Sequence, residues 1–295
     1  MKMKWEGAHV LVTGGDGFIG SRLSYKLREL GAEVTIASKN KSEASNFISI
    51  DVTNPRTLEF DGYDVVLHLA GIADPRICEE NPQEAFLVNS YGSLNVMEAC
   101  RRSGVGRMLL SSSAYVYGIP RYTPIDEKHP LSPVSAYGRS KVAAEHICKA
   151  YGATILRFFN VYGAGQRGEY LIPTIMSNLG KGSITLRNLG SKRDFVYVDD
   201  VVEAMLLAVD RAGECFNIGS GRGCTPQEIA ELLFEISGKH PQLTSLNIQD
   251  TVPELVADIS KAKKLLGWQP KVTLEEGLRK AFGGFMKESD ICSVL

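Results

Sequence analysis

The chain has 295 residues, of which 44% are hydrophobic and 23% are charged. This composition excludes a disordered, collagen-like or coiled-coil protein and predicts a globular fold with a large core. Because 33 basic residues stand against 34 acidic ones, the surface offers no broad positive field for nucleic acid or for an anionic membrane. We therefore expect a small-molecule partner, with no nucleic acid and no membrane.

The start of the chain does not resemble a targeting or membrane segment. The apolar run Val10–Val12 is far too short for a signal-peptide core or a membrane span. Six cysteines lie far apart without a Cys-x-x-Cys pair, which favours reduced thiols over disulfides or a zinc site, and the five histidines are equally scattered. We therefore expect a cytoplasmic protein with no bound metal.

Short apolar runs alternate with amphipathic stretches in the first half of the chain. The runs are typical of buried parallel strands, and the amphipathic stretches are typical of helices that end near a glycine. The expected strands cover residues 9–12, 33–37, 65–69, 108–111 and 153–157, and the expected helices cover residues 19–30, 84–102 and 136–150. Strict alternation of strand and helix predicts an α/β fold with a Rossmann-like, doubly wound parallel sheet.

Beyond about residue 165, prolines and glycines separate shorter helical stretches, but no linker or repeat divides the chain. We expect a Rossmann domain over residues 1–165, to which residues 194–220 return. The smaller C-terminal lobe would comprise residues 166–193 and 221–295. A ligand should bind in the cleft that the two parts share.

A glycine-rich turn, Thr13–Gly20, follows the first expected strand and opens the first expected helix. Gly14 permits a tight turn, Gly17 permits the close approach of a pyrophosphate, and Gly20 permits the helix to pack against the strand. The helix N-terminus adds unpaired N–H groups. In this context the motif predicts a dinucleotide site rather than a turn that is merely rich in glycine.

The end of the second expected strand carries Ser38, Lys39 and Asn40 instead of the acidic residue that usually binds the ribose of NAD. Ser38 and Lys39 could bind a 2′-phosphate, so these residues favour NADP. A basic loop exposed to solvent would explain them as well. The sequence therefore predicts NAD or NADP as the cofactor.

Two further segments indicate acid-base chemistry. Tyr137 and Lys141 lie one turn apart on an expected helix, where an ammonium can stabilise a phenolate and make the phenol a usable base. The spacing is common by chance, and a tyrosine packed over a lysine stem would also produce it. The fourth expected strand ends at Ser111 and runs into a serine-rich turn with Ser112 and Ser113 at the carboxyl edge of the sheet, where a hydroxyl can share a substrate proton with Tyr137. Serines at a strand end are otherwise often only turn formers.

Ordered motifs along the chain carry a resemblance to a known family. They are Thr13–Gly20, His68–Gly71, Ser111–Gly118, Tyr137 with Lys141, Arg157–Gly163, Arg193–Asp200, Phe216–Gly221 and Ala257–Trp268. In this order they resemble the extended short-chain dehydrogenase/reductase family, and most closely its nucleotide-sugar epimerase branch, typified by UDP-glucose 4-epimerase. The resemblance spans nearly the whole chain. It implies an NAD(P)-binding Rossmann domain, a substrate-binding smaller lobe and a nucleotide-sugar substrate.

The resemblance also implies roles for individual residues. Tyr137 would be the base, Lys141 its electrostatic partner and a ligand of the nicotinamide ribose, and Ser113 a hydroxyl bound to the sugar. Asn160 and Arg193 would contact the sugar diphosphate, and a guanidinium suits a diphosphate by its own chemistry. Besides the glycines of the turn, the other residues with an implied cofactor contact are Phe18, Ile19, Asp51, Val52, Leu69, Ala70, Gly71, Asn89 and Ser111.

Two departures from the family pattern narrow the function. Dehydratases of the family place Asp-Glu after the catalytic hydroxyl, whereas this chain has Ala114 and Tyr115, which speaks against dehydration. Members that bind a nucleoside diphosphate usually carry an Arg-x-Gly-Asp stretch before the last Ala-Asp, but Ile248 stands about where the arginine is expected. The nucleotide and the sugar therefore stay open.

We expect an NAD(P)-dependent nucleotide-sugar 4-epimerase in which Tyr137 removes the 4-hydroxyl proton, C4 loses and regains a hydride, and the 4-keto sugar turns over in the cleft. The alternative is an NADPH-dependent reductase of a 4-keto-6-deoxy nucleotide sugar with the same catalytic residues. A third hypothesis is a non-catalytic NAD(P)-sensing protein, which would have little use for Ser113, Tyr137 and Lys141 together. Apolar positions in residues 84–102 and 136–150 would support the homodimer that the family implies.

Overall fold

The computed structural model describes residues 3–40, 46–166, 168–248 and 252–293, with the backbone alone for residues 288–293. Its centre is a seven-stranded parallel sheet in the order β10-β6-β5-β4-β1-β2-β3. The strands are β1 (His9–Thr13), β2 (Glu33–Ser38), β3 (Phe47–Ser49), β4 (Val65–His68), β5 (Arg107–Ser113), β6 (Thr154–Phe158) and β10 (Cys215–Ile218). The predicted doubly wound α/β fold is therefore confirmed, and the strand order reverses between β1 and β4.

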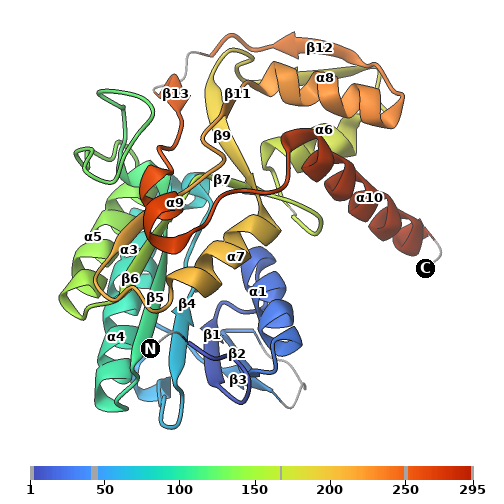
Figure 1. Cartoon of the computed structure of the whole chain (residues 1–295). Coiled ribbons are helices and arrows are strands. Elements are labelled where there is room, and N and C mark those ends of the chain that lie inside the picture. Colours follow the sequence, from blue (N-terminus) through green and yellow to red (C-terminus); the bar gives the residue numbers. More distant parts are fainter. Residues whose placement is uncertain (1–2, 41–45, 167, 249–251, 294–295) are drawn as a thin grey trace.

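Helices cover both faces of this sheet (Figure 1). One face carries α1 (Phe18–Glu29) and α7 (Val198–Ala208), and the other carries α4 (Gly92–Arg102) and α5 (Ala136–Ala150). Val10 of β1 belongs to the same core as Leu23 of α1, whereas the next residue, Leu11, belongs to the core of Met97 in α4. Successive strand residues point to opposite faces, so a continuous apolar strand needs a cover on both sides.

Most expected elements lie close to their predicted positions, but the helix expected over residues 84–102 is divided. Its parts are α3 (Pro82–Phe86), a π-helical turn (Leu87–Tyr91) and α4. The π-helical turn contains Asn89, which is buried and bonds to Ile72 and Ser140. Such turns inside helices are frequent at functional sites. The sequence pattern predicted neither this π-helical turn nor the short strand β3.

The smaller lobe lies above the sheet in the view of Figure 1. Its elements are α6 (Leu171–Asn178), β8 (Ser183–Leu186), α8 (Pro226–Ser237), β12 (Gln242–Ser245) and α10 (Leu274–Ser293), and β8 pairs with β12. Ile175, Leu233 and Leu278, one from each helix, are buried in a core of their own. Thr225 and Glu228 form a capping box that fixes the start of α8.

A second, small sheet stands between the main sheet and this lobe. It consists of β7 (Asn160–Tyr162), β9 (Lys192–Tyr197), β11 (Gly223–Cys224) and β13 (Glu254–Leu255), and β9 pairs with the other three strands. The remaining helical elements are α2 (Pro75–Glu80), α9 (Ser260–Leu266) and the 3₁₀ turns Pro55–Thr57 and Ala114–Val116. Because β9 leads directly into α7, the chain returns here from the smaller lobe to the main sheet.

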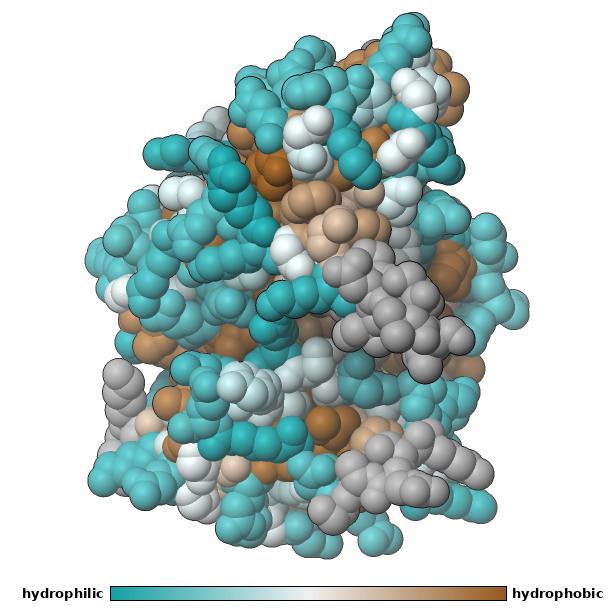
Figure 2. All heavy atoms as spheres, turned by 90° about the vertical axis from the view of Figure 1, so that its right-hand side faces the viewer, coloured by the Kyte–Doolittle hydropathy of each residue, from teal (hydrophilic) through white to brown (hydrophobic). Residues whose placement is uncertain are grey.

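The surface of the molecule is mostly hydrophilic on the side that Figure 2 shows, as expected for a chain of which 23% of the residues are charged. In the described part, no helix is long and apolar enough to cross a membrane. On this side, apolar residues appear in several separate places, in the upper half and also at the right and in the lower middle of the view (Figure 2). Most large apolar side chains are instead buried in the cores of the sheet and of the smaller lobe.

Candidate active site

The carboxyl ends of the central strands open into a cavity of about 1010 Å³. Its walls come from the glycine-rich turn, the ends of β2, β4 and β5, the helix α5 and parts of the smaller lobe. A ligand site is expected at this edge, next to the point where the strand order reverses. Every residue that the sequence singled out for cofactor, catalytic or substrate contact lines this cavity, with the exception of Asn89.

The glycine-rich turn has the shape that a dinucleotide needs. Gly14 has a φ of +68°, and a Cβ there would lie 2.8 Å from the backbone nitrogen of Ala70. A Cβ on Gly20 would lie 2.2 Å from the backbone oxygen of Gly14, so neither position accepts a side chain. Helix α1 starts after Gly17 without a side-chain cap, which leaves its first N–H groups available to an anion. These residues fit the pyrophosphate of NAD or NADP.

Ser38 and Lys39 line the cavity beside Asp51, but both already have carboxylate partners. Ser38 Oγ donates to Asp16 Oδ2 at 2.8 Å, and Lys39 Nζ lies 3.2 Å from Asp51 Oδ2. These contacts speak against the phosphate-binding role that the sequence suggested for the two residues. Sequence reasoning gave no role to Asp16, although an acidic residue inside the glycine-rich turn was the available signal.

Asn89 lies behind the cavity wall. Its Nδ2 donates to the backbone oxygen of Ile72 at 3.1 Å and to Ser140 Oγ at 3.0 Å, and its Oδ1 accepts from the backbone nitrogen of Ile72 at 2.8 Å. Ile72 lines the cavity in the segment after β4, and Ser140 lies on α5 between Tyr137 and Lys141. Asn89 therefore joins the cofactor side of the cavity to the helix that carries the predicted base.

The predicted catalytic residues meet at the end of β5. Ser135 caps α5 by accepting from the backbone nitrogen of Gly138, which places Tyr137 and Lys141 in the first two turns of the helix. Tyr137 is 7% exposed and is hydrogen-bonded to the side chain of Ser113, the last residue of β5. Lys141 Nζ donates to the backbone oxygen of Ser111 at 3.0 Å.

Burial controls the protonation of this group. Burial raises the pKa of the Tyr137 phenol, and the hydrogen bond from Ser113 opposes that rise. Burial also lowers the pKa of Lys141 to about 8, although Glu145 and two cysteines act in the opposite direction. A buried phenol becomes a useful base only when positive charge is placed next to it. A role of Tyr137 as a base therefore depends on Lys141 in its ammonium form.

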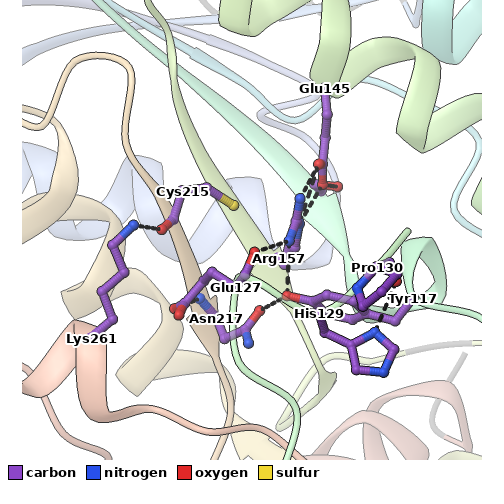
Figure 3. Close-up of polar contacts among 10 residues, drawn as sticks. Tyr117, Glu127, His129, Pro130, Glu145, Arg157, Cys215, Asn217 and Lys261 are labelled. Atoms are coloured by element: carbon purple, nitrogen blue, oxygen red, sulfur yellow. Dashed lines mark hydrogen bonds and ion pairs between the residues drawn. The ribbon is translucent and has the colours of Figure 1, made fainter. Parts of the chain in front are cut away.

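An ion pair behind the catalytic residues connects β5, β6 and α5. Arg157 Nη2 of β6 lies 2.6 Å from Glu145 Oε2 of α5, and both side chains are almost wholly buried. Figure 3 shows Arg157 between the carboxylate of Glu145 and the phenol of Tyr117, whose hydroxyl accepts from Arg157 Nη1 at 2.9 Å. Ser112, next to Ser113, donates to Glu145 as well. The network fixes the helix of Tyr137 against the strand of Ser113.

The other end of the cavity is lined by residues of β7 and β9 and by the end of β8, and it carries two arginines. Asn160 and Arg193 line it, and so does Arg187, to which sequence reasoning gave no role. The backbone nitrogen of Ile248 donates to the backbone oxygen of Arg187 at 3.1 Å. Arg187, at the end of β8, therefore lies beside Ile248, which occupies the position where the family pattern has an arginine.

A further polar group lines the cavity between its two ends. Arg76 of α2 pairs with Asp74 at 2.7 Å and also with Glu169 of the segment before α6. Tyr170 lines the cavity next to Glu169, and burial raises the pKa of its phenol. The sequence did not predict the ion pair of Arg76 with Glu169, because the two residues come from segments that are distant in the chain.

Comparison with known proteins identifies the family of the chain. Residues 10–219 match the model of the NAD dependent epimerase/dehydratase family. A solved UDP-glucose 4-epimerase of Thermotoga maritima with UDP-glucose is 34% identical, covers 95% of this chain and 99% of its own, and superimposes with a TM-score of 0.87. A solved epimerase of Methanothermobacter thermautotrophicus is 28% identical with a TM-score of 0.91, covering 97% of this chain and 94% of its own.

Relatives with another chemistry are similar to the chain as well. UDP-glucuronic acid decarboxylase 1 of Xenopus tropicalis is 32% identical, and the match covers 95% of this chain and 72% of the relative. The family is thus common to epimerases and decarboxylases, and the specific reaction is a separate question. The chain belongs to the NAD(P)-dependent epimerase/dehydratase family, the extended short-chain dehydrogenase/reductases that the motifs predicted.

Proposed function

We propose that the protein is a nucleotide-sugar epimerase that acts at C4 through a transient 4-keto sugar. The observation that carries the proposal is the meeting of Ser113, Tyr137 and Lys141 in one cavity that is also lined by Arg187 and Arg193. The first three residues suit proton transfer at a hydroxyl, and guanidinium groups suit a diphosphate.

The chain's own residues supply binding, orientation and the proton acceptor. Tyr137 takes the proton of the 4-hydroxyl, and Ser113 hydrogen-bonds to the same region of the sugar and to the phenol. Lys141 stabilises the phenolate and offers its ammonium to the nicotinamide ribose. A dinucleotide held by the glycine-rich turn and Lys141 would supply reversible hydride chemistry at C4.

The end of the catalytic strand supports epimerisation over dehydration. Ala114 and Tyr115 follow Ser113, so the acidic pair of a dehydratase is missing there. The alternative, an NADPH-dependent reductase of a 4-keto-6-deoxy nucleotide sugar, would need a 2′-phosphate site. The carboxylate partners of Ser38 and Lys39 make that alternative weaker.

Product analysis tests the proposal. The purified protein is incubated separately with UDP-glucose and UDP-glucuronate, and the products are identified by proton NMR. We expect the C4 epimer to form without net consumption of dinucleotide. Release of CO₂ with formation of a pentose product would instead identify a decarboxylase, and stoichiometric oxidation of NADPH with a 4-keto substrate would identify a reductase.

We also propose a cytoplasmic homodimer that uses the face of α3, the π-helical turn and α5. Phe86, Leu87 and Tyr91 are large apolar residues on this face that are 40–47% exposed. The described cysteines are free thiols, as in a reducing compartment. Leu87→Asp should convert a dimer to a monomer in light scattering, and a monomeric wild-type protein would rule the dimer out.

A further inference from the structure

Two carboxylates stand at the end of the cavity where the sequence suggested a phosphate site. Asp16 comes from the glycine-rich turn, and Asp51 follows β3. Both line the cavity together with Ser38 and Lys39 at the end of β2. This end lies beside the glycine-rich turn, and it is the part of a Rossmann sheet where the adenosine ribose binds.

The end of β2 holds the side chain of Asp16 in place. Asp16 Oδ2 accepts a hydrogen bond from Ser38 Oγ at 2.8 Å and another from Asn40 Nδ2 at 2.6 Å. The carboxylate is therefore carried by the turn but stands over the strand end, where other Rossmann sheets have an acidic residue. A carboxylate has about four acceptor sites, so it can accept further hydrogen bonds from the ribose.

Lys39 does not offset this charge, because it already faces Asp51. Thr53 donates to Asp51 Oδ1 through its backbone nitrogen at 2.9 Å and its hydroxyl at 2.7 Å. These bonds, with a smaller contribution from Lys39, hold the pKa of Asp51 below its usual range. Asp51 thus stays ionised and neutralises Lys39. Among Asp16, Lys39 and Asp51, an excess of one negative charge is left at this end.

We propose that Asp16 replaces the acidic residue missing from the end of β2 and makes the cofactor site select NAD over NADP. The ribose hydroxyls of NAD can donate to the carboxylate. A 2′-phosphate would bring close to two further negative charges against it and has no hydroxyl to donate there. The choice between NAD and NADP at Asp16 does not depend on which reaction the protein catalyses on the sugar.

Direct binding measures this selectivity. The wild-type protein, Asp16→Asn and Asp16→Ser are dialysed to equilibrium against an equimolar mixture of NAD and NADP, and the bound dinucleotides are quantified by chromatography. Asp61→Asn is the matched control, because Asp61 is an exposed carboxylate that does not line this cavity. Thermal unfolding verifies that each variant is folded.

We expect the wild-type protein to bind NAD at least about tenfold more tightly than NADP, and each Asp16 variant to reduce this ratio by about fivefold or more. Asp61→Asn should keep the wild-type ratio. Equal or tighter binding of NADP by the wild-type protein would overturn the inference even if both variants failed to fold. An unchanged ratio in the folded Asp16 variants would overturn the role of Asp16.

Discussion

The phenol of Tyr137 is hydrogen-bonded to the hydroxyl of Ser113, which joins the first turn of α5 to the last residue of β5. A donor on the phenol favours its ionised form, whereas burial opposes that form. The strength of Tyr137 as a base therefore depends on this contact and on the ammonium of Lys141.

Tyr137→Phe should lower turnover by about 10²-fold or more, because only the hydroxyl that moves the proton is lost from a buried ring. Turnover with the substrate identified by product analysis measures the effect. Tyr25→Phe removes a hydroxyl from a 62% exposed tyrosine of α1 and serves as the control. Near-wild-type turnover of Tyr137→Phe would refute the assignment of the base.

Lys141→Met should abolish turnover and stabilise the fold near neutral pH. Burial lowers the pKa of Lys141 from 10.5 to about 8, so between these pH values the unfolded chain binds more protons than the folded one. The cost of burying the ammonium is full below about pH 8 and disappears as the pH rises towards 10.5. The variant escapes this cost but loses the hydrogen bond to Ser111.

We expect a net gain of about 1–2 kcal/mol in the free energy of unfolding at pH 7, against an upper limit of about 3 kcal/mol from the shift alone. Urea unfolding without added dinucleotide at pH 7 and pH 10 measures it. The gain should shrink at pH 10. A loss of stability that is the same at both pH values would contradict the proposed charge state of Lys141.

Local patterns predicted the parts of the site that depend on neighbouring residues. The spacing of Tyr137 and Lys141 placed both on one helix. The glycines of the first turn predicted a tight turn at Gly14 and close packing at Gly20, and neither position has room for a Cβ. Alternation of strands and helices likewise predicted the sheet. These features follow from chemistry within one or two turns of the chain.

The sequence could not show contacts between distant segments. Arg187 stands beside Ile248 only because the chain after β12 runs next to the end of β8, a parallel pairing that periodicity does not reveal. Asp16 meets Ser38 for a similar reason, since β1 and β2 are neighbours in the sheet. Ser38 and Lys39 therefore suggested a phosphate site in the sequence, because the sequence does not show that they contact Asp16 and Asp51.

The ion pair of Glu145 and Arg157 is expected to dominate the stability of the catalytic helix. Glu145→Gln leaves a buried guanidinium without its counter-charge and should lower the free energy of unfolding by about 3–5 kcal/mol. Glu275→Gln, which breaks an exposed pair with Arg279, should cost less than about 1 kcal/mol. Urea unfolding compares the two, and the double variant Glu145→Leu with Arg157→Met should recover part of the loss. Equal effects of the two single variants would contradict the role of burial.

Arg193 and Arg187 are expected to hold the diphosphate of the substrate together. Asp194 does not need Arg193 as a partner, because its carboxylate accepts from the backbone nitrogens of Ser220, Gly221 and Ala257. Truncating a charged partner of a diphosphate commonly costs about 2–5 kcal/mol, which is about 30-fold or more in affinity. Arg193→Ala should weaken nucleoside diphosphate binding by at least this factor.

Arg187→Ala should weaken the same binding by about tenfold, since Arg187 is exposed and one guanidinium stays in place. Calorimetric titration of UDP, GDP, CDP and dTDP against the wild-type protein and both variants measures these effects and identifies the preferred base. NAD affinity is the internal control, because the glycine-rich turn lies at the other end of the cavity and should bind it unchanged. If no nucleoside diphosphate binds the wild-type protein more tightly than about millimolar, or if Arg193→Ala binds as tightly as the wild type, the arginines do not hold a diphosphate and the substrate is of another class.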